Sequence, residues 1–348
     1  MKNSVFHSLL AVDQPGPKAA ARWQLRKTVT DVVNAIRTSC QVINNLFTTA
    51  RHKTWLTGWL VMVGFAIGDN SAFVDDYPDV RSVQPDLVCP KTLEGTPEAG
   101  RRVWYGRKYG KTGDMAADAT LMLPENWYAN GKWPVFVELP GNGGYRDARG
   151  DECSGLPEDC CLGYGLTGGK DWIWVCLPFV SSDGSQLAKT WWGEAPAYDP
   201  TATLDFWKLV LDRVCEQYGG NQDCMVLAGF SRGSIAVNAL GLREPAFAGR
   251  WKAFVANSHY DGVRRWPFPD SDRKSATERL KQLNGRPQLI CGEGNQVDET
   301  QKYLQETGVD RKNLVFLPTG FCNHTDRWVL RPCKSREIAR KWLQSLQP

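Results

Sequence analysis

Short runs of apolar residues alternate with amphipathic segments along most of this chain, and this alternation restricts the fold more than any other feature. The runs are too continuous for half-exposed strands, in which every second side chain is polar. Six of them occupy 133–141, 171–180, 224–230, 251–258, 286–294 and 313–320. Continuous apolar strands are typical of a parallel sheet that is covered by helices on both faces.

Helical patterns separate these runs, and two further strands precede them. The helical segments are 201–219, 234–242, 298–308 and 335–346, and the early strands are 101–109 and 117–123. The alternation of strand and helix predicts the α/β class, with a mostly parallel central sheet and helices on both faces. With no repeat or low-complexity linker in between, residues 73–348 are predicted to form one catalytic domain.

The N-terminal 72 residues have the pattern of an exported leader. Arg51-His52-Lys53 precede fifteen residues without a charge (54–68), and small residues follow. This pattern predicts a signal peptide cleaved near Ala72, because a membrane span needs about 20 apolar residues. A membrane anchor is the alternative. The fifty residues before the basic group are unusual for a signal peptide, so translation beginning downstream of Met1 is a second hypothesis. We expect residues 73–348 to be secreted or periplasmic.

Charge and composition exclude some kinds of partner. The net charge is +4, yet residues 1–71 hold eight Lys/Arg against three Asp, which leaves 34 basic and 35 acidic residues in the remainder. This balance gives no basic surface for nucleic acid, and no stable membrane partner is expected. With 42% apolar residues the chain has enough for a sizeable core. Oligomeric state is not readable from these residues.

Ten cysteines follow residue 72, and an even, high count behind a signal sequence indicates disulfides. Cys153 and the adjacent Cys160-Cys161 pair are the strongest candidates. Buried free thiols are the alternative, and this fits Cys176 and Cys291, which lie in strand patterns, better than it fits the loop cysteines. Zinc is not expected, because only two histidines lie beyond residue 72 and no pair of C-x-x-C units occurs.

Ser231 is the candidate nucleophile. It lies in Gly229-Phe230-Ser231-Arg232-Gly233, which follows the run 224–230 and precedes the helical segment 234–242. The pattern G-x-S-x-G is weak alone, but a strand before it and a helix after it produce the sharp turn that exposes a serine hydroxyl. The two glycines relieve crowding in that turn. The alternative is an ordinary glycine turn capped by serine.

A serine nucleophile needs a base, and His324 is the candidate because it follows the last strand and precedes the terminal helix. The other histidine of this region, His259, is predicted to line the pocket. The acid is less defined. Asp261, just beyond the run 251–258, is preferred, and Asp298 is second because "DETQ" has the pattern of a capping box. Asn295 is a candidate neutral orienting group.

Acyl transfer also requires hydrogen-bond donors for the negative charge that develops on the substrate. The backbone N–H of Arg232 is one candidate, and the N–H of Asn142 in the glycine-rich loop 140–145 is the other. An ordinary turn is the alternative for this loop. The glycine spacing of "PGNGG" does not match a dinucleotide fingerprint, and no phosphate-binding lysine follows a glycine loop, so no organic cofactor is expected.

With these residues the chain resembles the α/β-hydrolase superfamily over about residues 100–345. The segment 204–233 is similar to the helix, Gly-Gly-Asn turn and elbow of secreted polyhydroxybutyrate-depolymerase-like and feruloyl-esterase-like serine esterases, and 121–144 is similar to the segment leading into their oxyanion loop. The resemblance implies that Ser231 is the nucleophile, His324 the base, and Arg232 and Asn142 the oxyanion donors. Two departures are Pro140-Gly141 in place of the family's His-Gly and Asn295 in its usual aspartate position. Arg232 after the serine also resembles glucuronoyl esterases, whose further elbow pattern is absent.

Aromatic residues near the expected sheet edge suggest the substrate. Tyr145, Trp191, Trp192 and Trp266 fall in loops, where exposed rings stack on sugars or phenols. The first functional hypothesis is therefore a secreted carboxylesterase acting on a small-molecule or polysaccharide-linked ester, such as an acetyl or feruloyl ester. The alternatives are a serine peptidase of the same fold and an inactive, hydrolase-like carbohydrate-binding protein. The aromatic residues could also belong to the core or to a lid.

Overall fold

Eight strands form one sheet in the computed structural model, which describes residues 77–106 and 118–347. The strands are β1 (Arg102–Tyr105), β2 (Ala119–Met122), β3 (Trp133–Leu139), β6 (Ile173–Cys176), β7 (Gly220–Phe230), β8 (Ala253–Asn257), β9 (Gln288–Gly292) and β10 (Leu314–Pro318). Each predicted apolar run overlaps one of them, and β7 begins four residues before its run. The eight predicted strands are therefore confirmed.

The order of strands across the sheet is β1-β2-β6-β3-β7-β8-β9-β10. All neighbours from β6 to β10 pair in parallel, whereas β1 pairs with β2, and β2 with β6, antiparallel. The mostly parallel sheet confirms the predicted α/β class. Parallel strands end at one common edge, so loops that follow β7, β8, β9 and β10 meet there.

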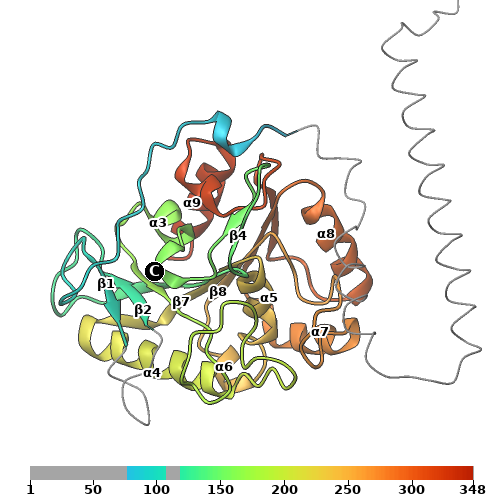
Figure 1. The fold of residues 1–348 in the computed structure, drawn as a ribbon, viewed down its shortest axis with the longest axis horizontal. Helices are drawn as coiled ribbons and strands as arrows, with labels where there is room; N and C mark the ends of the chain where they lie inside the picture. Colours follow the sequence, from blue (N-terminus) through green and yellow to red (C-terminus); the bar gives the residue numbers. More distant parts are fainter. Residues whose placement is uncertain (1–76, 107–117, 348) are drawn as a thin grey trace, which may run out of the picture. The chain divides into compact units, whose positions relative to one another are not determined.

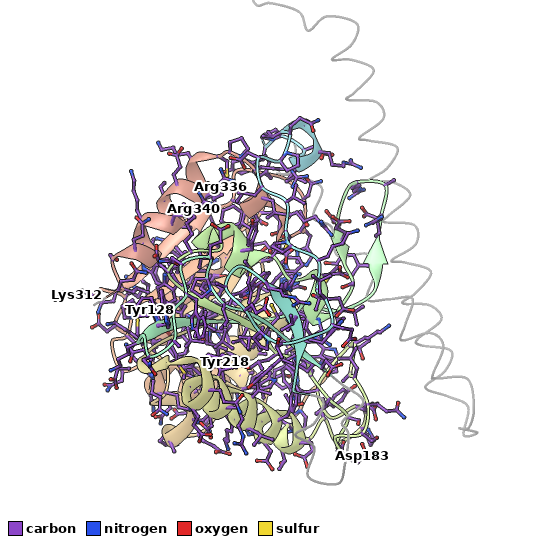
Figure 2. The ribbon with its side chains drawn as sticks, turned by 90° about the vertical axis from the view of Figure 1, so that its left-hand side faces the viewer. Tyr128, Asp183, Tyr218, Lys312, Arg336 and Arg340 are labelled. Carbon is purple, nitrogen blue, oxygen red and sulfur yellow. The ribbon has the colours of Figure 1, made fainter. Side chains whose placement is uncertain are left out.

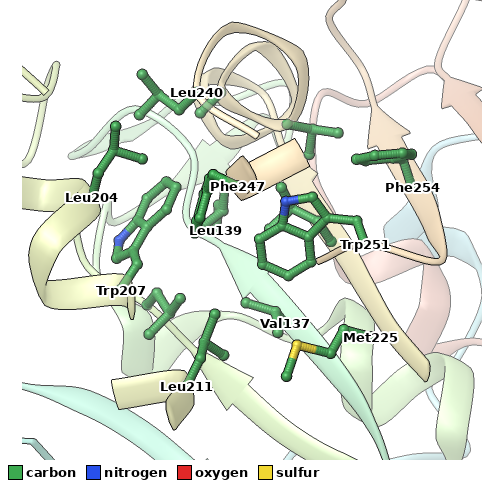
Figure 3. Packing of buried hydrophobic residues seen from close by; sticks show 14 of the residues in the cluster. Val137, Leu139, Leu204, Trp207, Leu211, Met225, Leu240, Phe247, Trp251 and Phe254 are labelled. Atoms are coloured by element: carbon green, nitrogen blue, oxygen red, sulfur yellow. The ribbon is translucent and has the colours of Figure 1, made fainter. Parts of the chain in front are cut away.

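Alternate side chains of the central strands enter two separate cores. In β3, Val135 and Val137 pack on one face and Phe136 on the other, and all three are fully buried. The helices that supply residues to the first core are α4 (Thr201–Tyr218), α5 (Arg232–Ala239), α6 (Pro245–Ala248), α7 (Arg273–Leu280) and α8 (Gln296–Thr307), and those of the second are α3 (Leu162–Thr167) and α9 (Lys334–Gln344). Figure 1 shows these helices around the sheet. Figure 3 shows Trp207 of α4 and Trp251 packed with Val137 and Met225 of the sheet.

Several elements carry too little periodicity to be predicted from the sequence. These are α3, α6, α7 and a small hairpin of β4 (Tyr145–Arg146) and β5 (Glu152–Cys153). Helix α3 contains two glycines and α7 is mostly polar, so neither has the apolar stripe of a longer helix. The start predicted for α8 was also wrong, because the helix begins at Gln296 with Asn295 as its N-cap residue.

The predicted disulfides are contradicted by the structure, in which all ten cysteines beyond residue 72 are free. Cys153 lies against Gly141, whereas the sulfur of Cys160 lies within 4.8 Å of the sulfur of Cys176 and the carboxylate of Glu138. Cys160 and Cys161 are both buried. Cys160 and Cys161 are therefore buried free thiols, which was the alternative, and Cys153 is a partly buried one.

The extension, signal peptide and cleavage near Ala72, together with the boundary at residue 73, lie outside the described residues. Export stays a prediction from the sequence. Within 77–106 and 118–347, no helix has both the length and the apolar character to cross a bilayer.

Candidate active site

Ser231 occupies a strained turn between β7 and α5. Its backbone φ is 53° and its ψ is −114°, a conformation rarely adopted by residues other than glycine. A Cβ atom at Gly229 would lie 2.2 Å from the backbone of Gly233, and one at Gly233 would lie 2.1 Å from the carbonyl oxygen of Leu139. The turn therefore requires both glycines, and its geometry is that of the strand-turn-helix elbow predicted from the sequence.

Three side chains from three strand ends form a hydrogen-bonded chain. The hydroxyl of Ser231 lies 3.0 Å from Nε2 of His324, and Nδ1 of His324 lies 2.5 Å from Oε1 of Glu293. A carboxylate only accepts, so Nδ1 carries the proton and Nε2 is free to accept from the serine. This is the arrangement of a nucleophile, a base and an acid that orients the base.

Burial and charge act in opposite directions in this chain. Burial disfavours the imidazolium form of His324, but the charge of Glu293 and its hydrogen bond outweigh burial and raise the pKa of His324 above the ordinary 6.5. Burial alone would raise the pKa of Glu293, and the charge and hydrogen bond of His324 reverse this, so the pKa of Glu293 lies below the ordinary 4.5. The pair therefore favours an ionised Glu293 next to a histidine that readily takes a proton.

Neither aspartate predicted as the acid contacts His324. Asp261 is buried and pairs with the guanidinium of Arg279 at 2.8 Å. Asp298 is exposed in the first turn of α8. Asn295 is exposed as well, and its amide bonds the carboxylate of Glu299. The position of the acid was therefore wrongly predicted.

Glu293 was missed because the position at which the resemblance places the acid is Asn295, two residues further along the chain. It follows Gly292 directly, at the carboxyl end of β9, where its side chain is 8% exposed. One signal was present: an ionisable residue at the end of a buried strand, on the edge where the strand carrying Ser231 also ends.

The glycine-rich loop after β3 lies against the nucleophile. A Cβ atom on Gly141 would approach Cβ of Ser231 to 3.2 Å, and the N–H of Gly143 is bonded to the carbonyl of Lys189 at 2.7 Å. Arg232 is the first residue of α5, where an N–H has no acceptor within the helix. The N–H groups of Arg232 and Asn142 therefore remain the candidate donors to an oxyanion.

The side chain of Arg232 has an unusual environment for a guanidinium. It is 1% exposed, lies 4.2 Å over the ring of Phe179, and donates to the carbonyl of Ala188 at 3.1 Å. Its Nε and Nη2 have no protein partner among the described residues. Burial lowers the pKa of Arg232 to about 9, so the guanidinium keeps its positive charge at neutral pH.

A pocket of about 320 Å³ lies next to the elbow. Gly141 and Phe230, which flank Ser231, form part of its wall, and Tyr145 forms another part. The ring of Tyr145 stacks on that of His324 with centroids 6.0 Å apart. Charged residues complete the lining, among them Asp326 and Arg327. The wall of the pocket thus combines an aromatic ring with polar groups, but neither Ser231 nor His324 is among its lining residues.

The ring of His324 also has His259 as a neighbour, whereas Trp191 and Trp192 do not lie where they were predicted. His259 lies with its ring centroid 4.9 Å from that of His324, and Trp266 lies 5.3 Å beyond it. Trp191 and Trp192, predicted to be exposed for substrate, are 9% and 2% exposed. They pack on Phe268, so the prediction that they form an exposed substrate platform is wrong. His259 and the half-buried Trp266 remain as residues that reach the site.

One buried cluster has potential metal ligands: Glu138, Cys160 and Cys176. The carboxylate of Glu138 already accepts four hydrogen bonds at 2.8 to 3.1 Å, from the N–H groups of residues 161–163 and from the indole of Trp174. The guanidinium of Arg102 lies 3.5 Å from the sulfur of Cys176. These contacts give Glu138 a structural role, anchoring α3 to β3, and a neighbouring cation opposes metal binding.

No protein-family model and no curated protein sequence matches this chain. Solved structures are similar to it at low identity. A ferulic acid esterase matches at 15% identity over 66% of this chain and 91% of its own, with a TM-score of 0.44. A thermostable esterase matches at 12% identity over 70% of this chain, with a TM-score of 0.44, and Porphyromonas gingivalis dipeptidyl peptidase 4 at 12% over 72%, with a TM-score of 0.45. The chain spans 62% of that esterase and 35% of that peptidase.

The strand order, the antiparallel β2 in an otherwise parallel sheet, and the serine on a turn between strand and helix define the α/β-hydrolase fold. The chain has this fold. The chemistry must be argued from the site itself, because one fold hosts many functions.

Proposed function

We propose that this protein is a serine hydrolase that cleaves carboxylic esters through a Ser231–His324–Glu293 triad. The observation that carries the proposal is the continuous chain of hydrogen bonds from the serine hydroxyl to the buried carboxylate. A serine hydroxyl is a weak nucleophile until a base removes its proton, and the imidazole is in position to do so.

The reaction proceeds in two halves. Nε2 of His324 takes the proton of Ser231 as the serine oxygen attacks the ester carbonyl, and the imidazolium is stabilised by Glu293. The same imidazolium protonates the departing alcohol and leaves an acyl-enzyme. Water, deprotonated by His324, then attacks the acyl group, and the imidazolium returns this proton to the oxygen of Ser231 as the acid is released. The N–H groups of Arg232 and Asn142 bind the oxyanion in both halves, and one such donor contributes roughly 3 to 4 kcal/mol.

The pocket beside the elbow, and not the aromatic loops, supports the proposed substrate class. The stacked Tyr145 and the polar residues of the lining suit an ester that joins a ring to polar groups, such as a feruloyl or acetyl ester on a polysaccharide. The hypothesis of an inactive binding protein was motivated by Asn295 in the position of the acid and by the aromatic loops. The contact of Glu293 with His324 argues against the first reason, and the burial of Trp191 and Trp192 argues against the second.

The test is acid release from acetyl, butyryl and feruloyl esters, measured beside release of amines from short peptides. We expect ester turnover that is lost in Ser231→Ala. Turnover of peptides with none of esters would replace the proposal by the peptidase alternative. Folded protein that turns over neither class, but binds sugars, would support the inactive alternative.

A further inference from the structure

Glu293 has more hydrogen-bond partners than a triad acid needs. Besides His324, the hydroxyl of Ser258 donates to Oε2 at 2.6 Å and the amide of Gln296 donates to Oε1 at 3.0 Å. Both partners lie at the same sheet edge, Ser258 directly after β8 and Gln296 as the first residue of α8. Each carboxylate oxygen is therefore held by a neutral donor in addition to the histidine.

The Gln296 amide is itself oriented by a second histidine. Its Oε1 lies 3.0 Å from Nδ1 of His259. Since Nε2 of Gln296 faces a carboxylate that only accepts, Oε1 must be the atom that faces His259, and Nδ1 of His259 must carry the proton. Burial, followed by the charge of His324, lowers the pKa of His259 to about 4, so this histidine is neutral near pH 7.

The backbone after β8 holds these donors in place. Ser258 has φ 82°, a strained value for a residue other than glycine, and its N–H donates to the carbonyl of Cys291 at 2.8 Å. The hydroxyl of Ser234 on α5 donates to the carbonyl of His259. Ser258 is thus hydrogen-bonded to β9, the strand that leads to Glu293. His259, the next residue, is hydrogen-bonded to α5, the helix that follows Ser231.

We infer that Ser258 and Gln296, with His259 acting through Gln296, are positioning residues that hold Glu293 in the orientation in which it accepts the hydrogen bond from the Nδ1–H of His324. This inference rests on the proposed triad and adds a neutral support to it. A charge-neutral donor at position 296 is central, because the site already contains one negative charge beside the base.

The charged surroundings of the pair are few. Asp151 accepts a hydrogen bond from the backbone N–H of His324 at 2.8 Å. The charges of Asp151 and Asp326 both raise the pKa of His324. The charge of Arg264 lowers the pKa of His259. Tyr145 is the remaining titratable neighbour, and burial raises its pKa far above neutrality. None of these groups donates to Glu293, so Ser258 and Gln296 have no substitute among the described residues.

The experiment compares Gln296→Glu, Gln296→Met and Ser258→Ala through the pH profile of kcat/KM on the best ester of the panel. Gln296→Met and Ser258→Ala each remove one donor to a charged group, and we expect kcat/KM to fall about ten- to a hundredfold. Gln296→Glu adds a second carboxylate of nearly the same shape. Two adjacent negative charges raise the pKa of His324 further, so the acid limb of the profile moves to higher pH.

The matched control is Asn295→Ala, one residue away from Gln296, because that amide contacts Glu299 rather than Glu293. It should keep the kcat/KM and the profile of the parent. A Gln296→Glu protein that is folded but inactive, beside an active Gln296→Met, also supports the inference, since the two differ in charge.

The inference is overturned if Gln296→Glu keeps the acid limb of the parent, or if Gln296→Met and Gln296→Glu lose the same activity at every pH, which indicates a merely structural role. Failure of the proposed function looks different: the parent's turnover would then survive Ser231→Ala. If turnover depends on Ser231 and the variants at 258 and 296 behave as the parent, only this inference fails.

Discussion

Two buried carboxylates, Asp261 and Glu293, lie beyond neighbouring strands, and their partners give them different tasks. The carboxylate of Asp261 forms an ion pair with the guanidinium of Arg279. Glu293 meets an imidazole that gains and loses a proton during the proposed reaction. Both side chains are removed from water, where an unpaired charge is costly. The charge of Glu293 can therefore stabilise the imidazolium of His324, whereas the charge of Asp261 is paired with Arg279.

Replacing Glu293 should remove activity without unfolding the protein. In Glu293→Gln the side chain carries no charge, so it does not stabilise the imidazolium of His324, and the wrong tautomer of His324 is favoured. We therefore expect kcat to fall about ten-thousandfold. Asp298→Asn, on the exposed turn of α8, should leave kcat unchanged. Ester turnover with circular dichroism of both variants checks this. A drop confined to Asp298→Asn would instead identify Asp298, the second of the two sequence-based candidates, as the acid.

The pH dependence follows from the pKa of His324. The base works only when neutral, so kcat/KM should fall as the pH drops through a pKa that lies above 6.5. In Glu293→Gln the charge that raises this pKa is gone, and the residual acid limb should move to lower pH. His259, with a pKa of about 4, adds no limb near neutrality. Profiles between about pH 4 and 9 decide the point; an upward shift in Glu293→Gln would contradict the assignment.

At the scale of elements, the elbow depends on backbones that come too close for any side chain. Strand β7, helix α5 and the loop after β3 meet at Gly229 and Gly233. This part of the site was predictable from the sequence, because strand, turn and helix are all local patterns. The acid was not, because its identity depends on which loop residue faces the base across the sheet edge, and spacing along one loop does not specify that.

Gly233→Ala should damage both stability and catalysis. Its Cβ would lie 2.1 Å from the carbonyl oxygen of Leu139, so the backbone must shift, and we expect a loss of about 3 kcal/mol in the free energy of unfolding. Gly285→Ala is the control: its φ is 70° but no atom lies within 4 Å, so about 1 to 2 kcal/mol is expected and turnover should persist. Urea denaturation measures the free energy of unfolding of the two variants, and an ester assay measures their turnover. Equal losses would mean that crowding at the elbow is overestimated.

At the scale of the whole molecule, segments far apart in the chain meet beside the base. The side chain of Asn323 accepts from the N–H of Val80 at 2.6 Å and donates to the carbonyl of Arg149 at 2.6 Å. Asp86 of the same leading segment pairs with Arg336 on α9, where Figure 2 labels it near Arg340. The sheet and its two-sided cover could be predicted from the sequence. These polar ties, and the burial of Trp191 and Trp192, could not, because they join loops without periodicity.

Asn323→Ala tests these ties. It leaves the buried N–H of Val80 without a partner, which costs about 1 to 3 kcal/mol. It also removes one of two hydrogen bonds to the carbonyl of Arg149, the other coming from Arg81, and so loosens the loop that carries His324. We expect a lower thermal midpoint together with reduced turnover per folded molecule. Ser335→Ala, which removes one exposed hydrogen bond to the carbonyl of Pro318, should change neither by much. Unchanged turnover in folded Asn323→Ala would show that the loop holds His324 without this residue.

The central claim is that Ser231 is a nucleophile activated by His324, and covalent trapping tests it most directly. The protein is treated with an alkyl fluorophosphonate, and its intact mass and labelled peptide are determined. We expect one adduct, on the peptide containing Ser231, absent in Ser231→Ala and formed far more slowly in His324→Ala. Folded protein that takes up no label, or that is labelled equally in Ser231→Ala, would contradict the claim.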